Sequence, residues 1–184
     1  TTFQGGVGFQ ISQGARAYFS YGTGIKNPGF FELYGFFDGR FIGNSVLQPE
    51  QSESWEIGLS QTINNDLLDL TAVYFDSRLK DEIFTTFPAP DFIASPANRA
   101  TLSRQKGVEI KATARLSQDL VLDAAYTHVS AKESGIEEVR RPNHIASGAL
   151  AWTFPKDSGH AILIIRYNGS TDDLAFTNPS FIPV

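Results

Sequence analysis

Residues 106–130 read KGVEIKATARLSQDLVLDAAYTHVS, and this stretch decides the fold. From Val108 to Leu116 every second residue is apolar, while glycine, threonine and charged residues occupy the alternate positions from Gly107 to Arg115. The polar triplet Ser117-Gln118-Asp119 follows, and residues 120–130 then resume the alternation. A period of two predicts strands with one apolar and one polar face, and the short turn predicts an antiparallel hairpin.

The same pattern recurs along the chain and predicts eight strands. Their ranges are 3–11, 15–23, 54–63, 67–77, 106–116, 120–130, 145–154 and 160–169. Short polar turns join them in pairs at 12–14, 64–66, 117–119 and 155–159. Long connections alternate with these turns, at 24–53, about 85–105, about 131–144 and from 170 onward.

Short turns on one side and long loops on the other are typical of outer-membrane barrels, whose short turns are periplasmic. In a globular domain, a connection as long as 24–53 would argue against the strand assignment. The hairpins have no fixed repeat length, which disfavours a propeller or a solenoid. The sequence therefore predicts an all-β fold, an antiparallel transmembrane β-barrel segment that extends over residues 1–184 as a single unit.

Five aromatic residues support a membrane setting. Each lies about 8 to 10 positions from a short turn and belongs to the set of alternate strand positions that is otherwise apolar, which we call the apolar parity. Strands rise about 3.3 Å per residue. Tilted strands would place all five rings at one height, as in the aromatic girdle at a membrane surface. The predicted girdle consists of Tyr21, Trp55, Tyr74, Tyr126 and Tyr167.

The alternative is a soluble antiparallel sandwich or a lipocalin-like barrel, whose strands also alternate. In that fold the apolar parity would face a core and the aromatic rings would lie at scattered heights. The girdle spacing and the loop asymmetry both favour the membrane barrel.

Composition excludes several classes of protein. No run approaches 18 consecutive apolar residues, so no transmembrane helix is expected. The net charge of -5, without basic runs, gives no electrostatic basis for binding nucleic acid. With no cysteine, the chain has neither disulfides nor thiolate metal sites.

Both ends of the sequence predict that the chain is an internal part of a larger protein. The chain contains no methionine and begins at Thr1 without a signal peptide. It ends in FIPV, residues 181–184, which we expect to be a loop-like tail because Pro183 interrupts strand pairing.

Two stretches, YGTGIKNPGFFELYG at 21–35 and GNSVLQPEQSESWEIG at 43–58, resemble the TonB-dependent outer-membrane receptors. That family has an aromatic-Gly pair, a Lys/Arg-x-Pro element, Glu-Leu-Tyr-Gly, Gly-Asn-x-x-Leu-x-Pro-Glu and a Glu-x-Gly that opens the next strand. Two further matches are Lys106-Gly107-Val108-Glu109 and Arg141-Pro142-x-His144. The YGT…K.P…LYG run is most similar to the vitamin B12 receptors within the family. Ser45 departs from the pattern, since proline is frequent at that position.

The resemblance implies a fold, a location and partners. A complete receptor of this family is a barrel of twenty-two strands that encloses an N-terminal plug carrying the TonB-contacting box, and this chain would be an internal portion of its C-terminal half. The implied function is TonB-energised uptake of an iron–siderophore complex or a cobalamin through the outer membrane of a Gram-negative bacterium. The implied partners are outer-membrane lipid, the chelate and the TonB complex, and no cofactor is implied. A free-standing eight-stranded barrel with a structural or adhesive role is the alternative.

No catalytic or metal site is predicted. His128 and His144 fall at the long-loop ends of their strands, whereas His160 falls at a short turn, so the three cannot ligate one metal. We interpret His144 as a residue that opens a strand. Ser130 and His128, with Asp172 or Asp173, could supply the groups of a hydrolase, but no nucleophile elbow accompanies them.

Loop 24–53 is the candidate ligand site. Its aromatic residues are Phe30, Phe31, Tyr34, Phe36, Phe37 and Phe41. Exposed apolar clusters of this size mark binding surfaces, and we predict ligand contacts from Phe36, Phe37, Asp38, Arg40 and Phe41. The alternative is that the rings only order the loop by packing on its neighbours.

Charged residues on the polar parity are expected to face the lumen. They are Arg16, Glu56, Asp69, Glu109, Lys111, Arg115, Asp123 and Arg166. They would line either a hydrated wall against a plug or a polar path for substrate.

Overall fold

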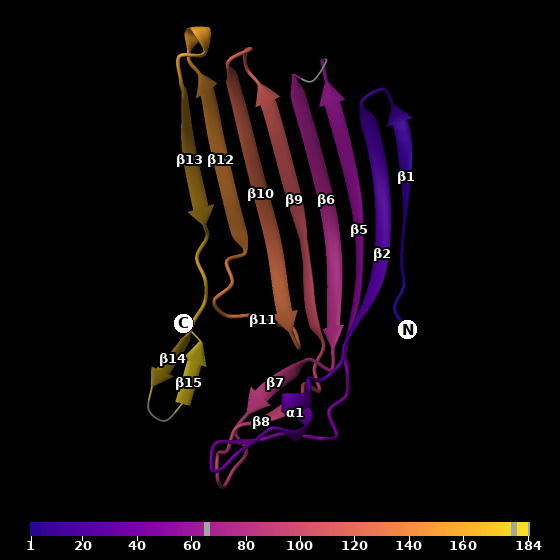
Figure 1. Cartoon of the computed structure of the whole chain (residues 1–184), viewed down its shortest axis with the longest axis vertical. Helices are drawn as coiled ribbons and strands as arrows, with labels where there is room; N and C mark the ends of the chain where they lie inside the picture. The colour runs from indigo at the N-terminus through magenta and orange to yellow at the C-terminus, as the bar shows by residue number, and fades with distance from the viewer. Residues whose placement is uncertain (65–66, 178–179, 184) are drawn as a thin grey trace.

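The computed structural model describes residues 1–64, 67–177 and 180–183, and its main feature is one antiparallel sheet of long strands (Figure 1). The long strands follow one another in chain order as a meander. They are β1 (Gln4–Ser12), β2 (Ala15–Lys26), β5 (Glu50–Ile63), β6 (Leu68–Lys80), β9 (Ser103–Arg115), β10 (Leu120–Glu133), β12 (His144–Thr153) and β13 (His160–Asn168). The eight predicted strands are therefore confirmed.

The strands differ from the prediction mainly at the long-loop side, where several continue further. β2 extends to Lys26 and β5 begins at Glu50, because the polar residues there still pair across the two strands. Short turns lie at one end of the sheet and long loops at the other (Figure 1). Of the predicted turn 64–66, residues 65 and 66 lie outside the described residues.

The long loops contain short elements of their own. These are α1 (Phe30–Tyr34), β3 (Phe36–Phe37), β4 (Phe41–Ile42), β7 (Ile83–Thr86), β8 (Ser95–Asn98) and β11 (Ile136–Glu137), and the 3-10 helix Pro155–Asp157 lies in the turn before β13. No helix in the described part of the chain is long and apolar enough to cross a membrane.

The predicted loop-like tail is wrong for the described residues. β14 (Leu174–Thr177) and β15 (Ser180–Pro183) form an antiparallel hairpin in which Pro183 pairs with Leu174. Proline is tolerated there because it is the last residue of an outer strand, where its missing N–H removes no ladder bond from a central position.

Gly14 shows how a short turn is fixed. Its φ of +86° lies in the left-handed region, and its carbonyl accepts a hydrogen bond of 2.7 Å from the Thr62 amide. A Cβ at this position would lie 2.6 Å from the Thr62 carbonyl oxygen. Only glycine avoids both the strain of a left-handed backbone and the clash of a Cβ with the Thr62 carbonyl. The turn between β1 and β2 can therefore lie against the end of β5.

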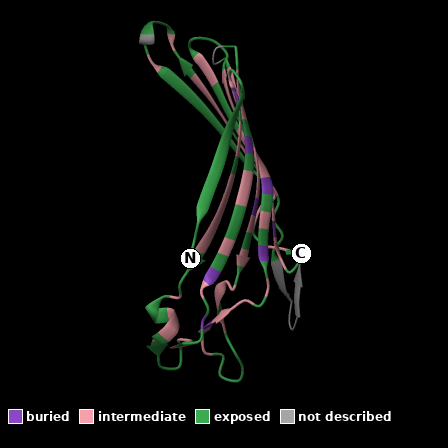
Figure 2. Ribbon diagram, turned by 90° about the vertical axis from the view of Figure 1, so that its right-hand side faces the viewer, coloured by how far each residue is buried: buried purple, intermediate pink, exposed green. Residues whose placement is uncertain are grey.

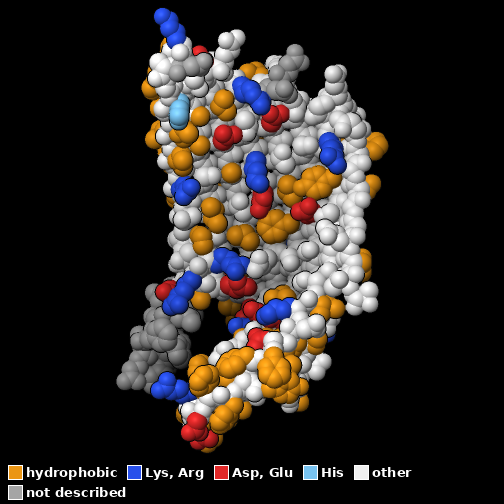
Figure 3. Space-filling view, in the orientation of Figure 1, with side chains coloured by type: hydrophobic (Ala, Val, Ile, Leu, Met, Phe, Trp, Pro, Cys, Tyr) orange, Lys and Arg blue, Asp and Glu red, His pale blue; other side chains and the backbone are white. Residues whose placement is uncertain are grey.

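The register gives the sheet one apolar and one polar face. On the apolar face, cross-strand partners such as Val7 and Phe19, or Ala72 and Ile110, continue from strand to strand. The opposite face carries the predicted lumen charges, and Figure 3 shows Lys, Arg, Asp and Glu side chains distributed over it. Asp69, for example, accepts a hydrogen bond from Thr62 at 2.7 Å and is paired with Arg115 at 3.2 Å.

β13 departs from the expected alternation. Ile162 and Ile164 pair with Ala151 and Ala149 of β12, which places them on the polar face. The run Ala161–Ile165 is apolar throughout, so its two faces can be distinguished only by pairing with β12. The polar face therefore ends in an apolar strip along β13.

The sheet has no hydrophobic core of its own. The buried apolar side chains among the described residues are Ala15, Leu47, Pro96 and Ala131, and Figure 2 shows buried positions scattered along the strands. Large apolar side chains of the apolar face are exposed instead, including Phe9 at 69% and Ile165 at 64%. A soluble sandwich would cover that face with a second layer, so the exposed apolar face disfavours the soluble alternative.

The sheet is open at both sides. Within the described residues, β1 pairs only with β2 and β13 only with β12. The first and eighth strands of the meander do not close a barrel by pairing with each other. This arrangement disfavours the free-standing eight-stranded barrel and is that of a segment of a wider wall.

Candidate ligand-binding surface at the long-loop end

Two long loops that are distant in sequence fold against each other at one end of the sheet. β3 and β4 form a small hairpin, and the Ile42 amide donates to the Ala94 carbonyl at 3.0 Å. The Ala94 amide donates in turn to the Arg40 carbonyl at 3.1 Å. These bonds attach the segment before β8 to the β3–β4 hairpin, so loops 27–49 and 81–102 form one unit.

The single turn of α1 is held at both ends. The Gly29 amide donates to the Glu32 carboxylate at 2.6 Å, and this bond caps the start of the helix. The Gly43 amide donates to the Gly35 carbonyl at 2.7 Å, and the Asn44 amide donates to the Glu32 carbonyl at 2.8 Å. A helix this short would not persist alone, so the segment after β4 supplies its stability.

Asn98 and Glu50 anchor the unit to the sheet. The Asn98 side chain accepts a hydrogen bond from the Gln48 amide at 2.7 Å and donates to the Gln48 carbonyl at 2.9 Å. It also donates to the Asp81 carbonyl at 2.7 Å. Glu50, at the start of β5, binds Lys26 at 2.9 Å and accepts a hydrogen bond from the Ile83 amide at 2.9 Å.

Arg99 makes a further anchor, to β10. Its guanidinium is 2.7 Å from Glu133 and 3.2 Å from Glu82, and it lies 4.5 Å above the centre of the Phe84 ring. The Thr101 hydroxyl donates to Glu133 at 2.7 Å. The loop that carries β7 and β8 is thus bound to β5 through Glu50 and to β10 through Glu133.

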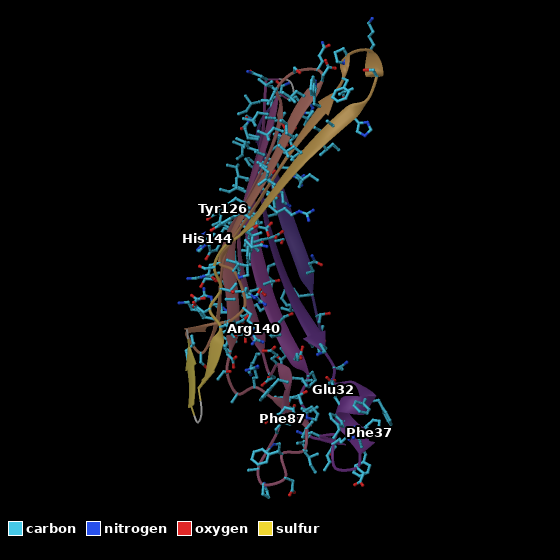
Figure 4. All side chains as sticks on the ribbon, turned by 90° about the vertical axis from the view of Figure 1, so that its left-hand side faces the viewer. Glu32, Phe37, Phe87, Tyr126, Arg140 and His144 are labelled. Atoms are coloured by element: carbon cyan, nitrogen blue, oxygen red, sulfur yellow. The ribbon has the colours of Figure 1, made fainter. Side chains whose placement is uncertain are left out.

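The aromatic residues of loop 27–49 form a shelf on this unit, which we define as Phe30, Phe31, Tyr34, Phe36, Phe37 and Phe41. Phe31 stacks on Phe41 with ring centres 4.6 Å apart and contacts Phe37 edge-on at 6.3 Å. Phe36 and Phe37 nevertheless remain 66% and 61% exposed. Figure 4 shows Phe37 and Glu32 at the long-loop end, beyond the strands.

The predicted ligand residues are brought together by the β3–β4 turn. Phe36, Phe37, Asp38 and Arg40 are exposed, whereas Phe41 is half-buried against Phe31. The Arg40 amide donates to the Phe37 carbonyl at 2.9 Å, and Gly39 adopts a φ of +64°, so the turn is tight. One carboxylate and one arginine, both exposed, therefore lie in the turn that directly follows the exposed phenylalanines.

Loop 81–102 adds aromatic residues that the sequence interpretation did not include. Phe87 and Phe92 are 59% and 67% exposed, and Phe92 lies two residues before Ala94, which contacts the β3–β4 hairpin. Figure 4 places Phe87 at the same end of the molecule as Phe37. A second group of phenylalanines in a long connection was the available signal.

The five predicted girdle residues share the apolar face. Tyr21 pairs directly with Trp55, whose ring lies 5.4 Å from that of Tyr74. Tyr126 and Tyr167 are the two cross-strand neighbours of Ala146. Tyr74 lies two residues nearer the short turns than Asp76, which is the direct partner of Trp55. Tyr126 likewise lies two residues nearer the short turns than His128, which pairs with the partner of Tyr74, Val108. Such offsets keep the rings at one height when the strands are tilted. We call these five residues the aromatic row.

The histidines occupy the predicted ends of their strands. His128 and His144 are cross-strand partners with rings 4.7 Å apart, and the Tyr126 hydroxyl is 2.8 Å from His144 Nδ1 (Figure 4). His160 pairs with Thr153 at the short-turn end. In the described part of the chain, no group of three or more His, Cys, Asp or Glu residues could hold a metal ion.

The possible hydrolase groups are engaged elsewhere. The Ser130 hydroxyl donates to Glu137 at 3.1 Å, and His128 Nδ1 lies 3.1 Å from the Asn143 carbonyl. Asp173 is paired with Arg140 at 2.8 Å. Among the described residues, the hydroxyl, imidazole and carboxylate are therefore bound to other groups and not to one another in the order that a catalytic triad requires.

Comparison with known proteins agrees with this architecture. The family described as "TonB dependent receptor-like, beta-barrel" matches residues 1–182. The chain is 29% identical over 158 residues to the vitamin B12 transporter BtuB of Photobacterium profundum, a match that covers 82% of the chain and 24% of that protein. The chain thus spans about a quarter of the length of this curated relative.

Solved structures share the fold at low sequence identity. The siderophore receptor PirA from Pseudomonas aeruginosa superposes with a TM-score of 0.76 at 17% identity, over 94% of this chain and 31% of PirA. The pyoverdine outer-membrane receptor FpvA from Pseudomonas aeruginosa gives 0.73 at 17% identity, over 97% and 26%. From its match over residues 1–182, this chain belongs to the TonB-dependent receptor β-barrel family.

Proposed function

We propose that this chain forms part of the wall and the outer loops of a receptor that imports a scarce metal chelate across the outer membrane of a Gram-negative bacterium. The chelate is an iron–siderophore complex or a cobalamin, and TonB supplies the energy through the plug domain of the whole receptor. Membership of a receptor and transporter family supports the general class.

The observation that carries the proposal is the ordered aromatic shelf at the long-loop end. Exposed phenylalanines offer a large apolar contact surface, and the anchored loops hold the rings so that little conformational freedom is lost on binding. Metal chelates of this kind are bulky, partly apolar and carry polar edges. Asp38 and Arg40, beside Phe36 and Phe37, would orient those edges.

A titration of the intact receptor tests the proposal. A panel of ferric siderophores and cobalamins is titrated against the wild type and two variants, Phe36→Ala/Phe37→Ala and Arg40→Gln. We expect one chelate to bind, and the double variant to weaken its affinity by about tenfold or more. Ile136→Ala is the control, because Ile136 is 73% exposed but belongs to another loop. The proposal fails if no chelate binds, or if the shelf variants bind as tightly as the control.

We also propose that the aromatic row marks the outer interface of the membrane. Spin labels at Tyr21, Tyr74 and Tyr167 of the receptor in bilayers should be accessible to oxygen to similar degrees. A label at Thr113, on the polar face, should respond mainly to a water-soluble relaxant. Unequal depths of the three labels in the bilayer would rule out a single interfacial band.

A further inference from the structure

Two histidines on the apolar face lie side by side just beyond the aromatic row. His128 of β10 and His144 of β12 are direct cross-strand partners, and their rings stack with centres 4.7 Å apart. His128 lies two residues past Tyr126, about 7 Å along the strand toward the long loops. Figure 4 shows His144 and Tyr126 together on the sheet, away from the long-loop unit that carries Phe37. The pair is therefore separate from the aromatic shelf.

The backbone brings these two side chains close together. The Val129 amide donates to the Asn143 carbonyl at 2.9 Å, and the His144 carbonyl accepts from the Gly169 amide, just after β13, at 2.7 Å. His144 thus directs its carbonyl toward β13, and His128 and His144 form a non-hydrogen-bonded pair. Such pairs have Cα atoms about 4.5 Å apart, closer than the roughly 5.5 Å of hydrogen-bonded pairs. Two imidazoles in this position can converge on one ion by side-chain rotation alone.

Each ring uses Nδ1 for a hydrogen bond inside the protein. His128 Nδ1 lies 3.1 Å from the Asn143 carbonyl, which can only accept, so in the neutral ring Nδ1 carries the proton and Nε2 keeps its lone pair. His144 Nδ1 lies 2.8 Å from the Tyr126 hydroxyl, which can accept as well as donate. Neither Nε2 atom makes a hydrogen bond within the described part of the chain. Histidines that bind metals are held in this way, with Nδ1–H on a second group and Nε2 on the ion.

The surroundings of the pair determine which ion fits. Its neighbours in the register on the same face are Val108 and Lys106 of β9 and Ala146 of β12, and none of these is a carboxylate. Calcium and magnesium need several oxygen ligands, whereas imidazole suits copper, nickel and zinc. The cationic Lys106 further disfavours an ion that is held by charge alone. The site therefore suits an ion that forms strong coordinate bonds to nitrogen.

Both rings are accessible to such an ion. His144 is exposed and His128 is half-buried. On the flank of His144 away from His128, a Cβ at Gly169 would lie 3.3 Å from the His144 Cβ. Glycine therefore leaves that flank free of a side chain and open to water.

We propose that His128 and His144 form a site for one divalent transition-metal ion of the copper, nickel and zinc class, bound through both Nε2 atoms. Water completes the coordination, because the sheet supplies two ligands here and His160 lies at its opposite end. The ion links β10 to β12 where β12 begins and where the connection 134–143 leaves the sheet. The inference does not depend on the proposed function, because the pair lies outside both the aromatic shelf and the polar face.

Copper(II) added to the intact receptor in phosphatidylcholine nanodiscs tests the site. Equilibrium dialysis measures the ions bound per receptor, and electron paramagnetic resonance identifies the ligands, because each bound imidazole nitrogen splits the copper signal. The wild type is compared with His128→Asn, His144→Asn and Tyr126→Phe. His160→Asn is the matched control, since it removes a histidine of the same sheet at the short-turn end.

We expect His128→Asn and His144→Asn each to bind one ion fewer than the wild type, and the lost signal to show two imidazole nitrogens. Tyr126→Phe keeps both ligands but loses the hydrogen bond that fixes the His144 ring, so its affinity for this ion should fall by about tenfold. The control should bind copper as the wild type does. If the half-buried His128→Asn variant fails to fold, the exposed His144→Asn variant decides the result alone.

Three outcomes would overturn the inference. The first is wild-type stoichiometry and affinity in the His144→Asn variant. The second is a lost signal with a single imidazole nitrogen, and the third is displacement of this ion by excess calcium. Chelate titrations on the same preparations separate the inference from the proposed function. A receptor that binds a chelate but no ion at the histidine pair overturns the inference alone, and one that binds the ion but no chelate overturns the proposed function alone.

Discussion

An arginine placed at two neighbouring positions of β9 should have very different effects on stability. Ala112 is on the apolar face, directly opposite Leu70 of β6 and Ala124 of β10. It lies two residues on the short-turn side of Ile110, the partner of Tyr126, and three residues from the end of β9 at Arg115. The apolar band extends from the aromatic row to the short-turn end of β9. At about 3.3 Å per residue, Ala112 lies about 7 Å along the strand from the first limit and about 10 Å from the second.

Thr113 is on the other face, between two carboxylates. Its cross-strand partners are Asp69 of β6 and Asp123 of β10, and its hydroxyl donates to Asp123 at 2.6 Å. Thr113→Arg loses that hydrogen bond, worth about 0.5–1.5 kcal/mol. It gains two accessible ion pairs, each worth about 0.2–1 kcal/mol. The net change should therefore lie within about 1 kcal/mol of zero.

Ala112→Arg has no such compensation, because both of its partners are apolar. A lysine or arginine on the lipid face costs about 2–4 kcal/mol near the middle of the bilayer. Denaturant unfolding of the intact receptor in lipid measures both values, and Ala112→Leu controls for the larger side chain without a charge. Equal losses from the two arginine variants, or a loss from Ala112→Leu as large as that from Ala112→Arg, would refute the assignment of the faces.

Two further predictions concern tight packing and the loops. Gly107→Ala should lower the free energy of unfolding by about 1–3 kcal/mol, because a Cβ there would lie 2.2 Å from the His128 carbonyl oxygen. Gly148→Ala, whose Cβ would have its nearest neighbour at 3.9 Å, should be neutral or stabilising by up to about 1 kcal/mol, and unfolding of the two variants side by side tests this contrast. Asn98→Ala removes the side-chain bonds to the Gln48 backbone, so limited proteolysis should cut loops 27–49 and 81–102 faster while barrel unfolding is unchanged. Gln48→Ala is its control, because Asn98 contacts only the main chain of Gln48, and equal cutting of both variants would contradict the anchoring role.

The candidate site could be predicted only in part. The aromatic composition of loop 27–49 predicted that Phe36, Phe37, Asp38 and Arg40 are exposed neighbours. This could be predicted because all four residues lie within one tight turn. The contribution of loop 81–102 could not be predicted, because its attachment depends on bonds such as that between Ala94 and Ile42, which are far apart in sequence. The stacking of Phe31 on Phe41, which half-buries one predicted contact, likewise arises from the packing of α1 on the hairpin.

The sequence by itself determined the strands, their order in the meander and the face of most side chains. These properties are local, because a strand alternates with a period of two and a short turn joins adjacent strands. The side-chain faces of β13 are the exception, because the apolar run Ala161–Ile165 has no alternation. In this strand, pairing with β12 determines which side chains lie on each face of the sheet. The tertiary structure alone decided which residues of different strands are opposite each other. The alignment of Arg78, Arg104 and Lys132, and the pairing of Thr113 with two carboxylates, depend on register between strands, and register is fixed only when the turns and the faces of all neighbouring strands are satisfied together.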